Sequence, residues 1–410
     1  MTAAPGDTGK YAGVFENPTF ASATAGASTQ TATSHSVFMI EQRRQRLFGS
    51  LRSTAIMAWH VTIVRNQGAV ALLAIGLAAA AAVSLSAASV PAPPSPDARA
   101  QLNGARANLV EHFALVQTRC RCAGSLQTRL DSELARLAEA DPGTQADGSA
   151  ALLASLEEGL IDQLVSGHYR GVGSIRDAGS TLIESKYDNS VQPLSVFVPP
   201  AYGAQKSAPL VVMLHAADQS ENELLSLAQL RQLASATGVL LALPWARGDD
   251  IASAAAASDT YDALDATEAA FSVDRRRVYL AGVSLGGIAL FKIGPAHPDR
   301  WTAFLSIAGT FTNDDLSAVG RNLRGKQVFM VAGGDDTFVK PSYIKAASAW
   351  LTSNGIESHY YEQPRGEHSF ASLDPAIERA WRDMLSGVRI NSSQPDFEMP
   401  SPQPTPSQKN

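Results

Sequence analysis

A serine set between glycines is the first feature of this sequence that could do chemistry. Ser284 stands in the stretch AGVSLGG, residues 281–287, after a run typical of a strand and before one typical of a helix. The Gly-x-Ser-x-Gly pattern also occurs by chance in loops, so its surroundings must decide. In a nucleophile elbow the serine sits on a tight turn that projects its hydroxyl into a cleft. Gly282, Gly286 and Gly287 are small enough for such a turn.

A serine hydroxyl needs a base, and a group that orients the base, before it can attack near neutral pH. Elbow hydrolases carry these groups in the chain order serine, acid, histidine. Two histidines lie late enough in the chain: His359 inside the expected strand SHYYEQ, and His368 in the loop PRGEHSF after it. A base must reach the serine, so it belongs on a loop at the sheet edge. We therefore predict that His368 is the base and that His359 is structural.

Four aspartates are candidates for the acid. Asp335 and Asp336 both follow Gly333-Gly334 at the end of an expected strand. The spacing Gly-x-x-Asp-x-x-Val over residues 333–339 favours Asp336, and the other aspartate of the pair would cap the next turn. Asp314 and Asp315 follow an earlier strand and are predicted to be helix caps.

Acyl transfer also needs N–H donors for the negative oxygen of its intermediate. We expect one from Leu285, the residue after the serine, and a second from Ala216 or Ala217, in the loop after the strand PLVVMLH. Trp245 ends another strand on the same edge. It is a candidate for the acyl or alcohol pocket, with simple packing as the alternative.

The elements that must position these residues alternate from residue 180 onward. Extended runs at 182–186 and 194–198 flank a turn signal and predict a hairpin. Six buried-strand patterns follow, at 209–215, 239–245, 277–282, 303–309, 327–334 and 358–363, with helical patterns near 224–237, 261–271, 285–294, 342–354 and 375–386. Continuous apolar strands with helical crossovers predict an α/β fold with a mostly parallel sheet covered by helices on both faces. Ligand sites of such sheets form at the carboxyl ends of the strands, where Ser284 lies.

Residues 169–385 resemble an α/β-hydrolase-fold serine esterase. The resemblance rests on QPLSVFVPPAY, VVMLH, VDRRRVYLAGVSLGG followed by HPDRW, AGGDDTFV and GEHSF. It points to exported polyhydroxybutyrate-depolymerase-like and feruloyl-esterase-like enzymes, and it implies Ser284, Asp336 and His368 as the triad. The family usually has His-Gly after the VVMLH-type strand, whereas here His215 is followed by Ala216. That departure puts the geometry of the oxyanion hole in question.

The expected activity is hydrolysis of a carboxylic ester through an acyl-serine, with a small-molecule or polymeric ester as substrate. This chemistry needs no metal and no organic cofactor. A serine peptidase or an acyltransferase on the same fold are alternatives within enzymes. A catalytically dead, anchored binding protein, with the helical region before the sheet as its working part, is the alternative outside them.

Composition limits the classes of function and partner that remain possible for this protein. The chain has 410 residues, is 45% hydrophobic and carries a formal net charge of −6, without a basic stripe in its second half, so we expect no nucleic-acid partner. Its two cysteines, Cys120 and Cys122, are too few for a disulfide framework. We expect two ordinary thiols on a helix, with a local bridge or a pair between chains as the alternatives. No zinc-type cluster follows them.

Residues 1–67 are predicted to be a disordered segment that ends in several arginines. Residues 68–90 are uncharged and would span roughly 34 Å as a helix, which predicts a transmembrane anchor or a signal segment. Arginines before the segment predict that the catalytic part is exported. A retained anchor is favoured, although a start at Met57 and a small-residue site at 86–88 would allow cleavage.

Leucines at helical spacing predict a proline-rich linker and amphipathic helices over residues 91–165, packed on the following domain or on a partner chain. The catalytic domain is predicted to span residues 166–388, and residues 389–410 to form a disordered tail rich in proline and serine. Because residues 166–388 hold their own strands, crossovers and triad, we expect them to fold and react without the helices.

Overall fold

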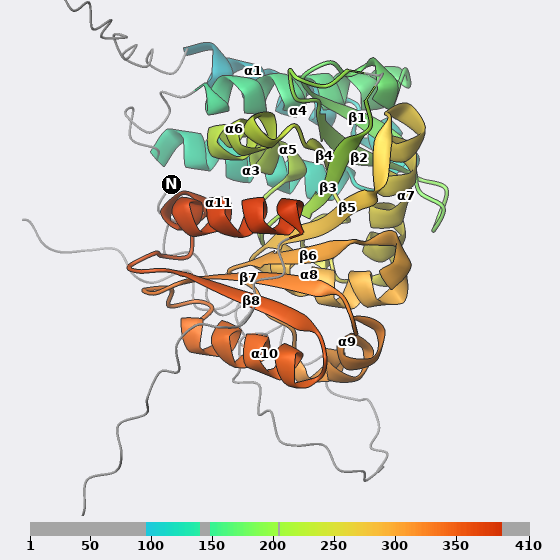
Figure 1. Ribbon diagram of the computed structural model, residues 1–410. Coiled ribbons are helices and arrows are strands. Elements are labelled where there is room, and N and C mark those ends of the chain that lie inside the picture. Colours follow the sequence, from blue (N-terminus) through green and yellow to red (C-terminus); the bar gives the residue numbers. More distant parts are fainter. Residues whose placement is uncertain (1–95, 140–147, 204–205, 388–410) are drawn as a thin grey trace, which may run out of the picture. The chain divides into compact units, whose positions relative to one another are not determined.

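The computed structural model describes residues 96–139, 148–203 and 206–387 (Figure 1). The predicted N-terminal segment 1–67, the predicted span 68–90 and the predicted tail 389–410 lie outside the described residues. Among the helices that are described, none is long and apolar enough to cross a membrane. The membrane and export predictions therefore remain predictions.

A single sheet forms the centre of the described structure. Its strands are β1 (Ala178–Glu184), β2 (Val191–Phe197), β3 (Ala208–Leu214), β4 (Leu240–Pro244), β5 (Val273–Val283), β6 (Ala303–Ile307), β7 (Gln327–Gly333) and β8 (Glu357–Gln363). Their order is β1-β2-β4-β3-β5-β6-β7-β8. The pairs β1–β2 and β2–β4 are antiparallel, and all the others are parallel. The predicted hairpin and the predicted mostly parallel sheet are both confirmed.

Helices cover both faces of this sheet, as the alternation of elements predicts (Figure 1). The core on one face includes side chains of α7 (Ala254–Ala270), α8 (Leu285–Ile293), α9 (Leu316–Asn322) and α10 (Pro341–Ser353). The core on the other face includes side chains of α5 (Glu221–Ser226), α6 (Ala228–Thr237) and α11 (Phe370–Ser386). Strands β3, β4 and β6 are buried along their whole length, which explains their continuous apolar sequences.

Two details of the helices differ from the sequence prediction. The single helix expected near 224–237 is divided into α5 and α6, because the backbone is extended at Leu227, where ψ is 116°. Helix α9 was expected only through its predicted caps, Asp314 and Asp315, and not from a helical pattern of its own. It has only seven residues, which is too short for an apolar period to stand out in the sequence.

The helical region before the sheet consists of α1 (Pro96–Glu111), α2 (Phe113–Cys120), α3 (Ala123–Glu139) and α4 (Ser149–Ser166). These helices pack on the α/β part of the chain, since Leu182 of β1 belongs to their apolar core. In return, Leu156 of α4 belongs to the core beneath α5 and α11. The two parts therefore share apolar side chains.

A buried charged cluster joins the same two parts. Arg129 of α3, whose side chain is only 3% exposed, forms ion pairs with Glu133 of its own helix, Glu157 of α4 and Glu221 of α5. Burial raises the pKa of Glu133, and it raises the pKa of Glu221 to about 7 against the attraction of Arg129. Removing one partner of such a cluster leaves a buried charge without compensation, which typically costs about 3–5 kcal/mol.

The cysteines also depart from the expectation of two thiols on one helix. Helix α2 ends at Cys120, and Arg121 adopts a left-handed conformation with φ of 55° before α3 begins. The turn brings the Cα atoms of Cys120 and Cys122 to 5.0 Å, within the range that a disulfide spans, and the two sulfurs are bonded. The local bridge, one of the alternatives from sequence, is therefore the state in this structure.

These contacts argue against independent folding of residues 166–388. We now expect this shortened chain to aggregate or to unfold without a cooperative transition, because it would expose Leu182 and its neighbours and remove the partner of Glu221. A chain of residues 96–388 is the matched comparison, and thermal unfolding followed by circular dichroism is the measurement. A soluble 166–388 chain with the same melting temperature as 96–388 would contradict the expectation.

The cluster also predicts how stability changes with pH. The pKa of Glu221 is about 7 when folded and 4.5 in its ordinary state, so folding favours the protonated carboxyl. Its contribution is complete below about pH 4.5 and is lost as the pH rises through 7, by on the order of 3 kcal/mol for a shift of this size. Urea unfolding near pH 5 and pH 8 should show this loss in the wild type and a smaller one in Glu221→Gln. Equal losses in the two proteins would refute the assignment.

Candidate active site

Ser284 occupies the turn between β5 and α8, the junction at which the sequence predicted a nucleophile elbow. Its φ of 52° and ψ of −113° place it in a backbone region that residues with a side chain rarely adopt. The Ser284 N–H donates a hydrogen bond to the carbonyl of Ile307 on the neighbouring strand β6, at 2.8 Å. Strain of this kind persists only where the surroundings enforce it, and it is common at functional sites.

The surroundings enforce the turn by close backbone contact. A Cβ atom on Gly282 would lie 2.3 Å from the carbonyl carbon of Gly286, and a Cβ atom on Gly286 would lie 2.4 Å from the carbonyl oxygen of Leu214. Both distances are far shorter than real contacts. Only glycine at these two positions lets α8 start this close to β3 and β5.

The structure brings the three predicted triad residues together. The imidazole of His368 lies with Nε2 2.8 Å from Ser284 Oγ and with Nδ1 2.7 Å from Asp336 Oδ2. The second carboxylate oxygen, Oδ1, accepts hydrogen bonds from the backbone N–H groups of Phe338 and Val339, each at 2.9 Å. The Asp336 side chain is fully buried, so the amides and the imidazole fix its orientation. These distances fit a serine that donates to a base held by an acid.

His359, the rejected base candidate, lies within β8. Its ring stacks on Phe329 with centroids 4.6 Å apart, and its Nε2 lies 3.1 Å from Glu357 Oε1. These contacts occupy the imidazole within the sheet, away from the carboxyl edge. These contacts fit the predicted structural role of His359.

The other aspartates do not join the triad. Asp335 follows β7, and its backbone N–H donates to the carbonyl of Gly366. Asp314 and Asp315 belong to the short 3₁₀ turn Asn313–Asp315. The Asp315 carboxylate accepts hydrogen bonds from the backbone and hydroxyl of Thr312, which is a capping arrangement.

The two candidate oxyanion donors in the loop after β3 differ in their partners. The N–H of Ala216 donates to the side-chain oxygen of Gln219 at 3.2 Å. The N–H of Ala217 has no acceptor among the described residues. Leu285 is the first residue of α8, so its N–H has no acceptor within the helix and carries the positive end of the helix dipole. Leu285 and Ala217 are therefore the available donors.

Trp245 does not line an open pocket, which corrects one interpretation of the sequence. Trp245 is only 5% exposed to solvent. The indole stacks on the imidazole of His215 with centroids 5.5 Å apart, and the guanidinium carbon of Arg129 lies 4.8 Å from the centre of the ring. The sequence did not indicate the contact between Trp245 and Arg129, because Arg129 lies in the helical region, far from Trp245 along the chain. Trp245 packs beneath the loop that follows β3.

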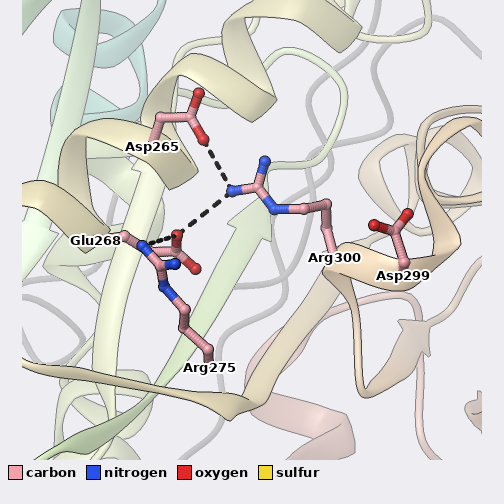
Figure 2. Close-up of a pocket in the computed structure, with 5 residues that line it drawn as sticks. All are labelled: Asp265, Glu268, Arg275, Asp299 and Arg300. Atoms are coloured by element: carbon pink, nitrogen blue, oxygen red, sulfur yellow. Dashed lines mark hydrogen bonds and ion pairs between the residues drawn. The ribbon is translucent and has the colours of Figure 1, made fainter.

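A surface hollow of about 360 Å³ lies elsewhere on the molecule, between α7, the start of β5 and the turn before β6 (Figure 2). Its lining residues are charged: Asp265, Glu268, Arg275, Asp299 and Arg300. Arg300 pairs with Asp265 at 2.8 Å, and Arg275 pairs with Glu268 at 3.5 Å (Figure 2). Arg275 and Ser284 are separated by roughly 30 Å of extended strand, so the hollow is remote from the triad. Among the described residues no cluster of side chains is suited to hold a metal ion.

Comparisons with known proteins give structural similarity only. No protein-family model and no curated protein matches the sequence. Among solved structures, a ferulic acid esterase is 16% identical with a TM-score of 0.45, and the alignment covers 51% of this chain and 98% of that one. This protein resembles serine esterases of the α/β-hydrolase fold. An S-formylglutathione hydrolase from Staphylococcus aureus is 16% identical with a TM-score of 0.42, covering 52% of this chain and 98% of that one. The fluorophosphonate-binding serine hydrolase F of Staphylococcus aureus is 15% identical with a TM-score of 0.42, covering 51% and 99%.

The elbow geometry predicts that Gly286→Ala is severely damaging. Its added methyl group would meet the backbone oxygens of Leu214 and His215, which cannot move without displacing β3, so we expect a loss of about 2 kcal/mol or more. Gly104→Ala is the matched control, because a Cβ there meets no atom within 4 Å and should stabilise α1 by up to about 1 kcal/mol. Urea unfolding measures both. A Gly286→Ala protein as stable as the wild type would show that the elbow is not as tight as described.

Proposed function

We propose that this protein is a serine hydrolase that cleaves carboxylic esters through an acyl-serine intermediate. The observation that carries the proposal is the continuous chain of hydrogen bonds from Asp336 through His368 to Ser284, with the serine on a strained turn at a helix start. A scaffold that had lost catalysis would have no need to keep the three side chains aligned. For this reason we favour an enzyme over a binding protein.

In the proposed reaction His368 Nε2 removes the hydroxyl proton of Ser284 as Oγ attacks the ester carbonyl carbon. The protonated imidazole then gives that proton to the leaving alcohol, which leaves the acyl group on the serine. Water repeats the cycle and releases the acid. Asp336 keeps the proton on Nδ1, so that Nε2 faces the serine, and it stabilises the imidazolium that forms.

Negative charge develops on the carbonyl oxygen during both attacks. We assign its stabilisation to the backbone N–H groups of Leu285 and Ala217, because neither has a partner within its own element. Loss of one such donor typically costs a factor of about 10²–10³ in turnover. The alanine at position 216 still allows this arrangement, since its own N–H is held by Gln219.

We also propose that the catalytic part is exported, either held by residues 68–90 or released after cleavage before the described region. The arginine-flanked uncharged stretch supports this. The disulfide between Cys120 and Cys122 supports it independently, because disulfides persist mainly in oxidising compartments.

The two late histidines give the sharpest test of the catalytic proposal. His368→Ala should fold normally and lose several orders of magnitude in turnover of p-nitrophenyl acetate, nearly as much as Ser284→Ala, because triad members act as a unit. His359→Ala should keep turnover per folded molecule within about tenfold of the wild type, a change of about 1.4 kcal/mol in the barrier. A folded, active His368→Ala or a folded, inactive His359→Ala would overturn the assignment.

The proposal of export is tested by finding where in a cell culture the protein is located. Protease added to intact cells should remove the hydrolase part if the chain is anchored, and the mature protein should appear in the medium if the chain is cleaved. Full-length protein recovered in the cytosolic fraction and protected from the protease would contradict export.

A further inference from the structure

The loop that carries Ala217 is short and has little internal support. This oxyanion loop, residues 215–220, joins the end of β3 to the start of α5. Within it, Gln219 accepts from the Ala216 N–H and donates its own N–H to the Ala216 carbonyl at 3.3 Å. A donor that stabilises a transition state must be held to within about half an ångström. The middle of the loop is held from outside, because the Asp218 N–H donates to Asp249 Oδ1 at 2.8 Å, and contacts at the two ends hold the rest.

The downstream end is held by the charged cluster of the helical region. Arg129 Nη1 donates to both carboxylate oxygens of Glu221, at 3.0 and 2.9 Å. Ser220, the N-cap of α5, donates its hydroxyl to Glu133 Oε1 at 3.0 Å. Glu133 is itself paired with Arg129 at 3.4 Å. Residues 220 and 221 are thus fixed to α3.

The upstream end is held by the same arginine through an aromatic contact. The guanidinium of Arg129 lies over the indole of Trp245, which in turn stacks on His215. The two ring nitrogens of His215 lie 2.8 Å from the Ala216 carbonyl oxygen and 3.0 Å from the Trp245 carbonyl oxygen. His215 is buried, which lowers its pKa, and its ring fills the space between the indole and the loop.

One guanidinium is therefore linked to both ends of the loop: it bonds the Glu221 carboxylate directly after the loop, and it lies over Trp245, which stacks on His215. We propose that Arg129 is a positioning residue for the oxyanion loop, which makes the helical region part of the catalytic unit. The inference rests on the proposed function, since it concerns where the Ala217 N–H lies when the oxyanion forms. A lysine cannot replace this arginine, because an ammonium group lacks both the planar fork and the flat face.

Displacing the oxyanion loop should affect mainly the rate of the chemical step. The Ala217 N–H acts on an oxygen that becomes negative only in the tetrahedral state, so its displacement lowers kcat more than it changes KM. A role limited to stability would lower the amount of folded protein and leave kcat per folded molecule unchanged.

The test compares Arg129→Lys with Arg136→Lys in the full-length chain. Arg136 lies two turns further along α3 and contacts neither Trp245 nor Glu221; it pairs at 2.7 Å with Glu223, which accepts the Ser220 N–H, and a lysine keeps the charge of this pair. Each variant is measured for kcat and KM on p-nitrophenyl acetate and for hydrogen exchange of the peptide covering residues 214–220. Trp245→Leu is a third variant, which removes the aromatic contact and leaves every charge in place.

Arg129→Lys and Trp245→Leu should each lower kcat by about tenfold or more, an oxyanion-type effect, with KM nearly unchanged and faster exchange in residues 214–220. Arg136→Lys should match the wild type in both measurements. Folded Arg129→Lys or Trp245→Leu with wild-type kcat and exchange would overturn the inference, as would an equal loss in Arg136→Lys. If the wild type itself neither hydrolyses the ester nor reacts with a fluorophosphonate, the proposed function fails, and loop exchange alone then decides the positioning role.

Discussion

The close approach of three backbone segments at the start of α8 is the constraint on which the rest of the site depends. Gly286 touches the end of β3, Gly282 touches Gly286, and Ser284 is held at positive φ between them. Because these contacts are between backbone atoms, they leave almost no freedom in where the Ser284 hydroxyl lies. The parallel strands then deliver the acid and the histidine to the same edge, from positions 52 and 84 residues further along the chain.

The helical region contributes to the position of the loop that carries Ala217, through the charged cluster around Arg129. Its buried arginine is surrounded by more carboxylates than it can neutralise, and one oxygen each of Glu133 and Glu157 has no hydrogen-bond partner among the described residues. A buried ionic cluster is weak evidence for stability, since desolvation offsets much of the attraction. Its value is geometric: the hydrogen bonds from Arg129 Nη1 to both Glu221 oxygens, and the guanidinium over the indole, fix distances that apolar packing would leave adjustable. The cluster adds fixed contacts beside the two ends of the loop that carries Ala217, whose middle is held by the hydrogen bond from Asp218 to Asp249.

Sequence reasoning reached the strands and the three side chains that the structure brings together, Ser284, Asp336 and His368, because both leave local signals. Continuous apolar runs mark buried strands, and chain order with loop position separates His368 from His359. The same reasoning gave packing of Trp245 and the bridge at Cys120 only as alternatives, and it missed the dependence of α5 on α3. The contacts of Trp245 and of α5 depend on side chains far apart in the chain: Arg129 and Glu221 are separated by 92 residues, and neither has a local pattern that indicates its partner. The bridge is local and depends on the left-handed turn at Arg121. The extent of helix α9 was missed for the opposite reason, since its seven residues are too few to show a period.

The central claim is that Ser284 is a nucleophile activated by the histidine beside it. It is tested most directly by reacting the full-length protein with a fluorophosphonate and locating the adduct by peptide mass spectrometry. The account predicts a single adduct on Ser284 that forms at least a hundredfold more slowly when His368 is replaced by alanine, because the unassisted hydroxyl is a weak nucleophile. An adduct on another residue, or no adduct on a folded protein, would contradict it.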